Sequence, residues 1–357
     1  MRKTANIQEK ILAVIQRGAP LTDTRFNALA LELFEWQLAR NAPNRRYCCG
    51  KKVRHWREIP SVPTTAFKEA SLTTISPRKR VVEFRSSGTT LHLAQGRLHQ
   101  NQSRHFHSEE TLVVYEASVR EGFKHFLITG RDACATLYFL TASPKETPHS
   151  SLVWMMETIR REWGGEFFVR DGRVDCARLL RRLTSPFPSY SSSFYLLGTA
   201  LAFAQFFDYL ERKRLRLKLP AGSWAMETGG FKGQRREISQ AVFFEQFENY
   251  LGLNEKRIIS EYGMCELSSQ FYTSRISLLT PRSFFGPPWA RALVIDPETG
   301  REAREGKRGL IRVIDLANVG SVLAVQTEDV GVRRGDEFEL LGRAPMAEVR
   351  GCSLMIR

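Results

Sequence analysis

The sequence is poor in cysteine and has no long hydrophobic run. Its six cysteines among 357 residues, two of them adjacent at Cys48-Cys49, show neither a disulfide framework nor the paired spacing of a zinc site. The first residues lack the apolar segment of a signal peptide. The longest apolar stretch, residues 194–210, contains Gln205 and Asp208 and is shorter than the roughly 20 residues of a membrane helix. We therefore expect reduced thiols, a cytoplasmic protein without a transmembrane segment, and a buried element over residues 194–210.

Acidic residues are too few to balance the basic ones. Lysine and arginine number 53 against 38 aspartates and glutamates, which gives a net charge of +15. The basic residues are scattered in pairs and triplets and form no stripe with interleaved aromatic residues, so we predict no nucleic-acid partner. A basic surface that attracts ATP, acidic carriers or an acidic protein explains the charge equally well.

The hydrophobic pattern predicts an α/β fold. Short β-prone runs alternate with helical periods between residues 80 and 280, which is typical of parallel βα units. Asp23 is a candidate N-cap for an early helix. The expected strands are 81–85, 135–141, 166–169, 193–197, 223–227 and 257–260, then 292–295, 309–315 and 321–326 in a β-rich part; the expected helices are 152–163, 175–183, 200–210 and 237–251. We expect four regions: helical 1–79, an α/β core over 80–280, a smaller β-rich part over 281–343, and a tail over 344–357.

A hydroxyl-rich loop follows the first predicted strand. Its residues are Ser86, Ser87, Gly88, Thr89 and Thr90. The glycine gives the backbone freedom to turn N–H groups and hydroxyls toward one anion, for which a nucleotide phosphate is the natural candidate. The Gly-Lys-Ser/Thr ending of a P-loop NTPase is absent, and an ordinary surface turn is the alternative interpretation.

Two more glycine-containing loops follow predicted strands. The loop over 228–233 contains Gly229, Gly230 and Lys232, and the loop over 262–266 begins with Tyr262 and Gly263. Ligands of open α/β sheets bind beyond the carboxyl ends of the strands. The three loops are therefore predicted to line one crevice.

Two carboxylates are candidates for binding a nucleotide and its metal. Glu266 ends the third loop and suits Mg²⁺, which takes one or two carboxylates, although an acid at a helix start is an equal alternative. Asp329 lies in the polar stretch 327–331 and is suited to accept hydrogen bonds from a ribose diol. A hairpin turn is the alternative there.

Taken in order, these motifs resemble those of the adenylate-forming (acyl-CoA synthetase-like) superfamily. Within it, the sequence is similar to the acyl-protein synthetases of bacterial bioluminescence, which are long-chain fatty acid ligases. The motifs that carry the resemblance are Ser86-Ser87-Gly88-Thr89-Thr90, Tyr262-Gly263-Met264-Cys265-Glu266, Thr327-Glu328-Asp329, Gly342-Arg343 and Arg350-Gly351-Cys352-Ser353-Leu354. Leu91 and Cys265 depart from the pattern, where a glycine and a threonine are usual.

The resemblance implies a fold, cofactors and residue roles. It implies the large domain of an adenylate-forming enzyme without the C-terminal lid domain, with ATP and Mg²⁺ as cofactors. It implies a fatty acid substrate and an acyl reductase or another acyl acceptor as partner, and it is compatible with a homo- or hetero-oligomer. It assigns ATP binding to Ser86, Ser87, Gly88, Thr89, Thr90, Gly229, Gly230, Tyr262, Gly263, Asp329 and Arg343, metal binding to Glu266, and catalysis to Cys352, Glu266, Lys232 and Arg343.

The implied reaction has two halves. The fatty carboxylate first forms an acyl-adenylate, and Cys352 then takes the acyl group as a thioester. Without the lid domain, Lys232, Arg97 or Arg343 must offset charge on the α-phosphate. An acyl- or aryl-CoA ligase of the phenylacetate type and a non-catalytic nucleotide- or acyl-binding subunit are the alternatives.

Two groups of side chains have a simple structural interpretation. His105 and His107 are expected at the surface, although they also lie near the position where relatives place a residue close to the substrate carboxylate. Phe203, Phe206 and Phe207 are expected to pack in the core, although they are also candidates to wall an acyl-chain tunnel.

Overall fold

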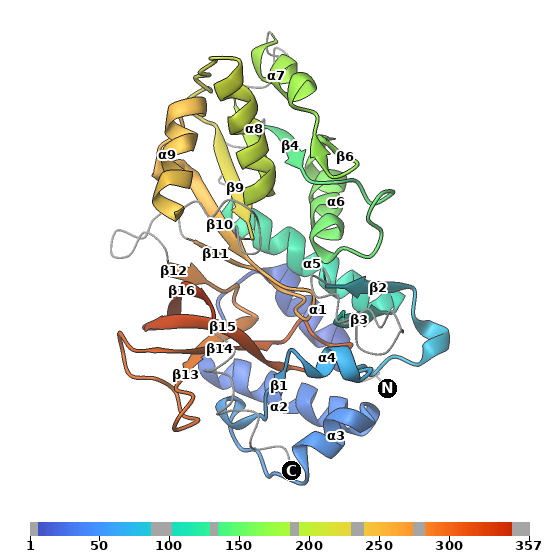
Figure 1. Cartoon of the computed structure of the whole chain (residues 1–357). Helices are drawn as coiled ribbons and strands as arrows, with labels where there is room; N and C mark the ends of the chain where they lie inside the picture. Colours follow the sequence, from blue (N-terminus) through green and yellow to red (C-terminus); the bar gives the residue numbers. More distant parts are fainter. Residues whose placement is uncertain are drawn as a thin grey trace, which may run out of the picture. The chain divides into compact units, whose positions relative to one another are not determined.

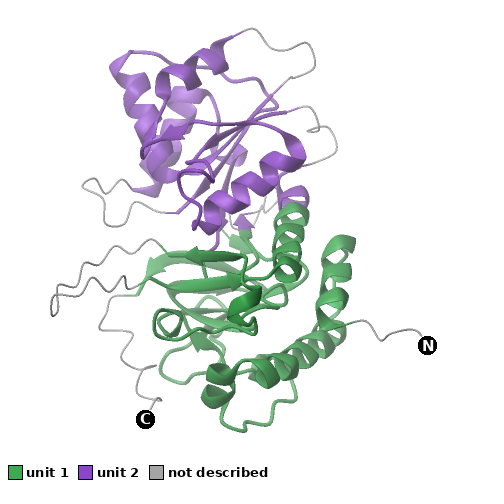
Figure 2. Ribbon diagram, turned by 90° about the vertical axis from the view of Figure 1, so that its right-hand side faces the viewer, with its two compact units in different colours: residues 1–122, 264–271, 282–357 green, residues 123–263, 272–281 purple. Residues whose placement is uncertain are grey.

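The computed structural model describes residues 6–86, 102–128, 135–185, 193–229, 239–273 and 283–344. The chain forms two compact units (Figure 2). Unit 1 combines residues 1–122, 264–271 and 282–357, and unit 2 combines residues 123–263 and 272–281. Each unit therefore contains segments that are distant in the sequence.

Unit 1 begins with three helices, α1 (Ile7–Arg17), α2 (Asp23–Arg40) and α3 (Ala42–Cys48). The predicted apolar face of α2 is confirmed, since Phe26, Leu29, Ala30 and Leu33 are buried. The predicted N-cap is wrong by one residue. The hydroxyl of Thr22, not the carboxylate of Asp23, accepts a hydrogen bond from the backbone N–H of Arg25 at 3.2 Å.

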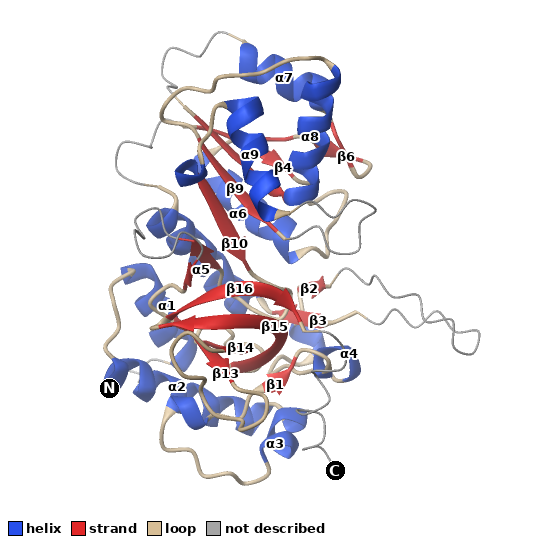
Figure 3. Ribbon diagram, turned by 60° about the vertical axis from the view of Figure 1, so that its left-hand side comes forward, coloured by secondary structure: helices blue, strands red, loops and turns tan. Residues whose placement is uncertain are grey.

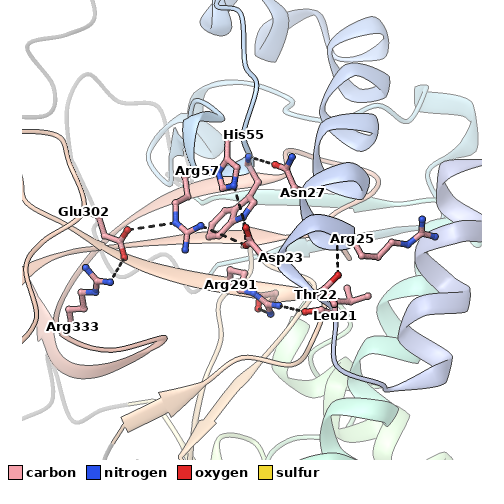
Figure 4. A network of polar contacts seen from close by, with 12 residues as sticks. Leu21, Thr22, Asp23, Arg25, Asn27, His55, Arg57, Arg291, Glu302 and Arg333 are labelled. Carbon is pink, nitrogen blue, oxygen red and sulfur yellow. Dashed lines mark hydrogen bonds and ion pairs between the residues drawn. The ribbon is translucent and has the colours of Figure 1, made fainter.

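The carboxylate of Asp23 has other partners (Figure 4). It accepts a 2.8 Å hydrogen bond from the indole N–H of Trp56 and lies 3.7 Å from the guanidinium of Arg57. Arg57 in turn contacts Glu302 at 3.8 Å, and Glu302 contacts Arg333 at 3.2 Å. These polar contacts tie the start of α2 to the β-rich carboxy-terminal part of unit 1.

An antiparallel sheet forms the β-rich part of unit 1 (Figure 3). Its strand order is β13-β14-β15-β16-β12, and the short strand β1 pairs with β15 in parallel. β15 is longer than predicted and has register shifts against both neighbours. The strands are β1 (Val62–Pro63), β12 (Ser283–Phe285), β13 (Ala290–Ile295), β14 (Arg308–Asp315), β15 (Ala324–Arg334) and β16 (Glu337–Arg343).

A separate hairpin of unit 1 carries the predicted strand before the hydroxyl loop. β2 (Val82–Arg85) pairs with β3 (Arg104–His107) in antiparallel register. α5 (Glu109–Phe126) follows β3. The remaining short elements are η1 (Trp56–Glu58), α4 (Ala66–Glu69) and η2 (Pro77–Lys79).

Unit 2 contains the predicted parallel sheet, with strand order β10-β9-β8-β4-β5 (Figure 1). The predicted strand 166–169 is instead two short strands that meet at Phe168. The strands of unit 2 are β4 (Thr136–Leu140), β5 (Glu166–Phe167), β6 (Val169–Arg170), β7 (Arg173–Val174), β8 (Phe194–Thr199), β9 (Trp224–Thr228) and β10 (Ile258–Tyr262); β11 (Phe271–Thr273) follows at the boundary of the units.

Four predicted helices of unit 2 are confirmed with shifted ends: α6 (Ser151–Trp163), α7 (Cys176–Thr184), α8 (Ala200–Arg212) and α9 (Gln240–Leu251), with η3 (Glu255–Arg257) after α9. As predicted, Gly252 ends α9, in left-handed conformation with φ 68°.

The aromatic side chains of α8 form core, as predicted. Phe203 and Phe207 contact Phe247 of α9 with ring centroids 4.8 Å and 4.9 Å apart, and Phe206 is fully buried. α8 therefore packs against α9 within one apolar cluster of unit 2. In the part of the chain that the structure describes, no helix has the length and apolarity to cross a membrane.

Candidate nucleotide site

The hairpin of β2 and β3 holds the first residue of the predicted phosphate loop. The backbone N–H of Ser86 donates to the carbonyl of Ser103 at 3.1 Å, and the backbone N–H of Ser103 donates to the hydroxyl of Ser86 at 2.9 Å. These reciprocal bonds fix the point where the loop leaves β2. The other predicted loop residues, Ser87, Gly88, Thr89 and Thr90, lie outside the described residues.

Glu266 is buried beside this hairpin. The residue is only 6% exposed, and its backbone carbonyl accepts a 3.0 Å hydrogen bond from the side-chain amide of Asn318. Burial raises the pKa of the Glu266 carboxyl, while the Ser103 hydroxyl and the charges of Arg343 and Lys68 act in the opposite direction. Glu266 lies in a turn and not in a helix, so its role as a helix-start acid is excluded.

The surroundings of Glu266 fit a metal that bridges to phosphate. Mg²⁺ takes one or two carboxylates and completes its shell with water and phosphate oxygens. Across the described ranges, histidine, cysteine and acidic side chains form no group of three or more that is suited to hold a metal ion. A single carboxylate such as Glu266 is compatible with Mg²⁺ that is bound together with nucleotide phosphates.

Cys265 takes the place of the threonine that the family motif has before the glutamate. Its thiol donates to the carbonyl of Ser103 at 3.8 Å, so it fulfils the hydrogen-bonding role of a hydroxyl. Burial raises the pKa of this thiol well above its usual value, and the charge of Glu266 adds to the effect. Cys265 is therefore a neutral structural residue and not a nucleophile.

His105 and His107 are buried, so the expectation of surface imidazoles is wrong. They are only 1% and 2% exposed, and their rings stack with centroids 4.6 Å apart. His105 and His107 are alternate residues of β3, so their side chains point to the same side of the strand. Burial lowers the pKa of His105 to about 4 and that of His107 well below its usual value.

His105 supports the loop that carries Glu266. Its Nδ1 lies 2.9 Å from the carbonyl oxygen of Cys265, a distance at which a neutral ring donates its N–H. The sequence offers a weak signal for this role, because two histidines at alternating positions of a predicted strand share one face. Only the contact with Cys265 shows which segment that face supports.

Asp329 and Arg343 are brought together by the pairing of β15 with β16. The two residues are register partners, and Nε of Arg343 lies 3.8 Å from Oδ1 of Asp329. Asp329 lies within a strand, so the alternative of a hairpin turn is wrong. Its backbone N–H donates to the hydroxyl of Thr327 at 3.1 Å. The 71% exposed side chain of Arg343 leaves its guanidinium accessible to an anion.

In unit 2, two predicted residues follow parallel strands. Tyr262 is the last residue of β10 and is buried, with Gly263 directly after it. Gly229 follows β9 with φ 79°, a conformation that favours glycine. Both positions lie at the carboxyl edge of the parallel sheet, as predicted. Gly230 and Lys232 of this unit lie outside the described residues, as do Arg97 and Cys352 of unit 1.

A pair of buried glutamates at the same edge was not predicted. Glu227 precedes the end of β9 and Glu261 precedes the end of β10, and burial raises the pKa of each to about 7. The hydroxyl of Thr228 donates to the carboxyl of Glu261. Sequence reasoning missed the pair because an acid in an apolar strand gives no sign of which neighbouring strand it will face.

Comparison with solved structures defines the class of the fold. A 2-hydroxyisobutyryl-CoA ligase in complex with 2-HIB-AMP and CoA matches with a TM-score of 0.66 at 13% identity, over 92% of this chain and 77% of that one. ATP-bound MatB from Rhodopseudomonas palustris matches with a TM-score of 0.53 at 16% identity, over 76% of this chain. The chain spans about half the length of MatB, covering 49% of it. The fold is that of the adenylate-forming ligases.

Sequence comparison narrows the class. Residues 189–357 match the acyl-protein synthetase family, LuxE. The long-chain-fatty-acid–luciferin-component ligase of Aliivibrio fischeri is 22% identical over 347 residues, which cover 91% of this chain and 86% of that protein. Its counterpart in Vibrio harveyi is 21% identical over 340 residues, covering 90% and 84%. These matches confirm the resemblance to the acyl-protein synthetases and support the assignment of the chain as a ligase.

Proposed function

We propose that the protein activates a long-chain fatty acid with ATP and Mg²⁺ and transfers the acyl group to its own Cys352. The observation that carries the proposal is the environment of Glu266. This buried carboxylate lies beside the origin of the phosphate loop and within the electrostatic influence of Arg343 and Lys68. A carboxylate combined with hydroxyls and cations is suited to a metal–nucleotide complex.

In the first half-reaction, a carboxylate oxygen of the fatty acid attacks the α-phosphorus of ATP. The bond between the α-phosphorus and pyrophosphate breaks, and the products are acyl-adenylate and pyrophosphate. The hydroxyls of residues 86–90 would hold the departing phosphates, and Asp329 would accept hydrogen bonds from the ribose. Glu266 would hold Mg²⁺, which neutralises phosphate charge when it is bound. Arg343, Lys232 and Arg97 are the candidate cations for the α-phosphate.

In the second half-reaction, Cys352 loses its proton and its sulfur attacks the acyl carbonyl carbon. The bond from that carbon to AMP breaks, and the acyl group remains as a thioester. An acyl reductase or another acceptor would then receive the acyl group. The two relatives are named long-chain-fatty-acid–luciferin-component ligases, which supports a long-chain fatty acid as the group that is transferred.

Exchange of labelled pyrophosphate into ATP tests the first half-reaction. The wild type should catalyse exchange only when a long-chain fatty acid is present. Glu266→Gln should abolish exchange, because the neutral amide loses the charge that attracts the metal, while near-native circular dichroism and melting behaviour show that the variant folds. Exchange at the wild-type rate by Glu266→Gln would refute the metal assignment, and a lack of exchange by the wild type with any acid would favour a non-catalytic subunit.

A second candidate function is an acyl- or aryl-CoA ligase, since the solved structures with the same fold include a 2-hydroxyisobutyryl-CoA ligase. Such an enzyme would release free acyl-CoA and would not need Cys352. Adding coenzyme A to the exchange mixture separates the two functions. Formation of acyl-CoA at an undiminished rate by Cys352→Ala would favour the CoA ligase.

A further inference from the structure

A dense run of basic residues follows α8 in unit 2. Residues 212–218 read Arg-Lys-Arg-Leu-Arg-Leu-Lys, with five cations in seven positions. All five basic side chains are exposed. This segment is the most concentrated group of basic residues in the described part of the chain. It is denser than the scattered pairs and triplets expected from the sequence.

The backbone of this segment is anchored to the end of α9. The N–H of Leu217 donates to the carbonyl of Tyr250 at 2.8 Å, and the N–H of Leu219 donates to that of Leu251 at 3.0 Å. Leu217 and Leu219 pack on the apolar cluster of α8 and α9. Leu217 and Leu219 thus face the core, whereas Leu215 and the five cations are exposed.

The outward row consists of Arg214, Arg216 and Lys218. Arg214 lies in the turn after α8 with φ 55°, whereas Arg216 and Lys218 are alternate residues of the segment that follows, where such residues are about 6–7 Å apart in an extended chain. None of these three side chains takes part in an ion pair with another residue in the described ranges. The exposed Lys256, close to the end of α9 in sequence, adds a further cation.

Helix ends alone do not account for so many cations. The carboxyl ends of α8 and α9 carry partial negative charge and favour one or two basic residues nearby. Five basic residues within seven positions exceed that requirement, and their charges repel one another in the absence of a ligand. The row is thus suited to an anionic partner.

The segment lies away from the predicted nucleotide loops of unit 2. α8 begins at the carboxyl end of β8 and returns along the sheet, so its own end lies at the opposite edge (Figure 1). Gly229 and Tyr262, in contrast, follow or end strands at the carboxyl edge. The row of cations is therefore not part of that edge, and a partner at the molecular surface must explain it.

We propose that residues 212–218 bind the surface of a membrane that contains anionic lipids. Clusters of four to eight exposed lysines and arginines are attracted to such surfaces, each contributing about 1 kcal/mol. Leu215, which is 37% exposed and flanked by the cations, supplies an apolar side chain at the same place. An exposed run of cations with an apolar side chain among them matches a surface of many mobile phosphates above an apolar interior. The inference does not depend on the proposed reaction.

Sedimentation with lipid vesicles tests the proposal on the full-length protein. Vesicles of phosphatidylcholine that contain about one third phosphatidylglycerol should bind the wild type at low salt. Vesicles of phosphatidylcholine alone should not bind it. The triple variant Arg214→Gln, Arg216→Gln, Lys218→Gln should lose about a hundredfold in partition coefficient. Binding should also fall steeply as the salt concentration rises.

A matched control removes the same charge elsewhere. Arg46, Lys51 and Lys52 are exposed in unit 1, and their replacement by glutamine leaves the net charge equal to that of the first variant. This control should bind the anionic vesicles within about twofold of the wild type. Equal losses in both triple variants would overturn the proposal, because overall charge would then be responsible.

The same pair of variants distinguishes a lipid from an acidic protein. The wild type could fail to bind anionic vesicles and bind immobilised polyglutamate, with that binding lost in the triple variant at residues 214, 216 and 218. This result would overturn the membrane proposal in favour of an acidic protein partner. Circular dichroism and thermal unfolding of each variant exclude misfolding as the cause of lost binding.

Discussion

The buried glutamates of unit 2 give the stability of the protein a specific dependence on pH. Glu227 on β9 and Glu261 on β10 are fully buried and interact with each other, and burial raises the pKa of each carboxyl from 4.5 to about 7. The folded state therefore keeps these protons up to neutral pH. The unfolded chain releases them at about 4.5.

The sign follows from proton linkage. Between pH 4.5 and 7 the folded state holds more protons than the unfolded state, so the free energy of unfolding falls as the pH rises through this window. A shift of this size corresponds to about 3 kcal/mol for one isolated carboxyl. Glu261→Gln keeps the neutral form at every pH and still accepts the hydrogen bond from Thr228. The variant should match the wild type at pH 4.5 and exceed its stability by up to about 3 kcal/mol at pH 8.

Urea unfolding at several pH values measures this difference. Glu245→Gln on the exposed surface of α9 is the matched control, because it removes the same charge from the solvent-facing side. The control should change the free energy of unfolding by less than about 0.5 kcal/mol at either pH. A constant difference between Glu261→Gln and the wild type from pH 4.5 to 8 would refute the reasoning, since no proton would then distinguish the two states.

Three further predictions concern unit 1. His105→Ala should lower the free energy of unfolding by about 1–3 kcal/mol, since the buried carbonyl of Cys265 loses its hydrogen-bond donor, and His105→Asn should recover part of it in thermal melts. Because burial lowers the pKa of His105 to about 4, stability should decline as the pH falls from 6.5 toward 4, and His105→Asn should reduce that decline. Trp289→Phe should cost about 1–3 kcal/mol in urea unfolding, because the hydroxyls of two buried serines lose the indole N–H; an unchanged midpoint would contradict this.

The parallel sheet, and the position of Gly229 and Tyr262 at its carboxyl edge, could be predicted from the sequence. Apolar strands alternate with helical periods in unit 2. Such local patterns predict the fold because the spacing of apolar residues reflects which side of a strand or helix is buried. The resemblance also assigned Asp329 and Arg343 to the same predicted ATP site, and their pairing across β15 and β16 brings them together. In unit 2 the strong signal was a pattern that repeats along the chain.

Features that depend on distant partners could not be predicted. His105 and His107 are polar, so composition favours the surface, yet the contact with Cys265 and the stacking of the two rings hold them inside. Asp23 has the residue type of an N-cap, but the indole of Trp56 binds its carboxylate and Thr22 caps the helix instead. The chemistry of a side chain limits which groups it can bind, but the fold determines which of those groups lies close to it.

The central claim is that this ligase forms a thioester on Cys352 from an acyl-adenylate. Intact-protein mass spectrometry after incubation with ATP, Mg²⁺ and a long-chain fatty acid tests it most directly. We predict one acyl adduct on the wild type that hydroxylamine removes, and no adduct on Cys352→Ala, which should nevertheless retain pyrophosphate exchange. An adduct of the same size and lability on Cys352→Ala would contradict the claim.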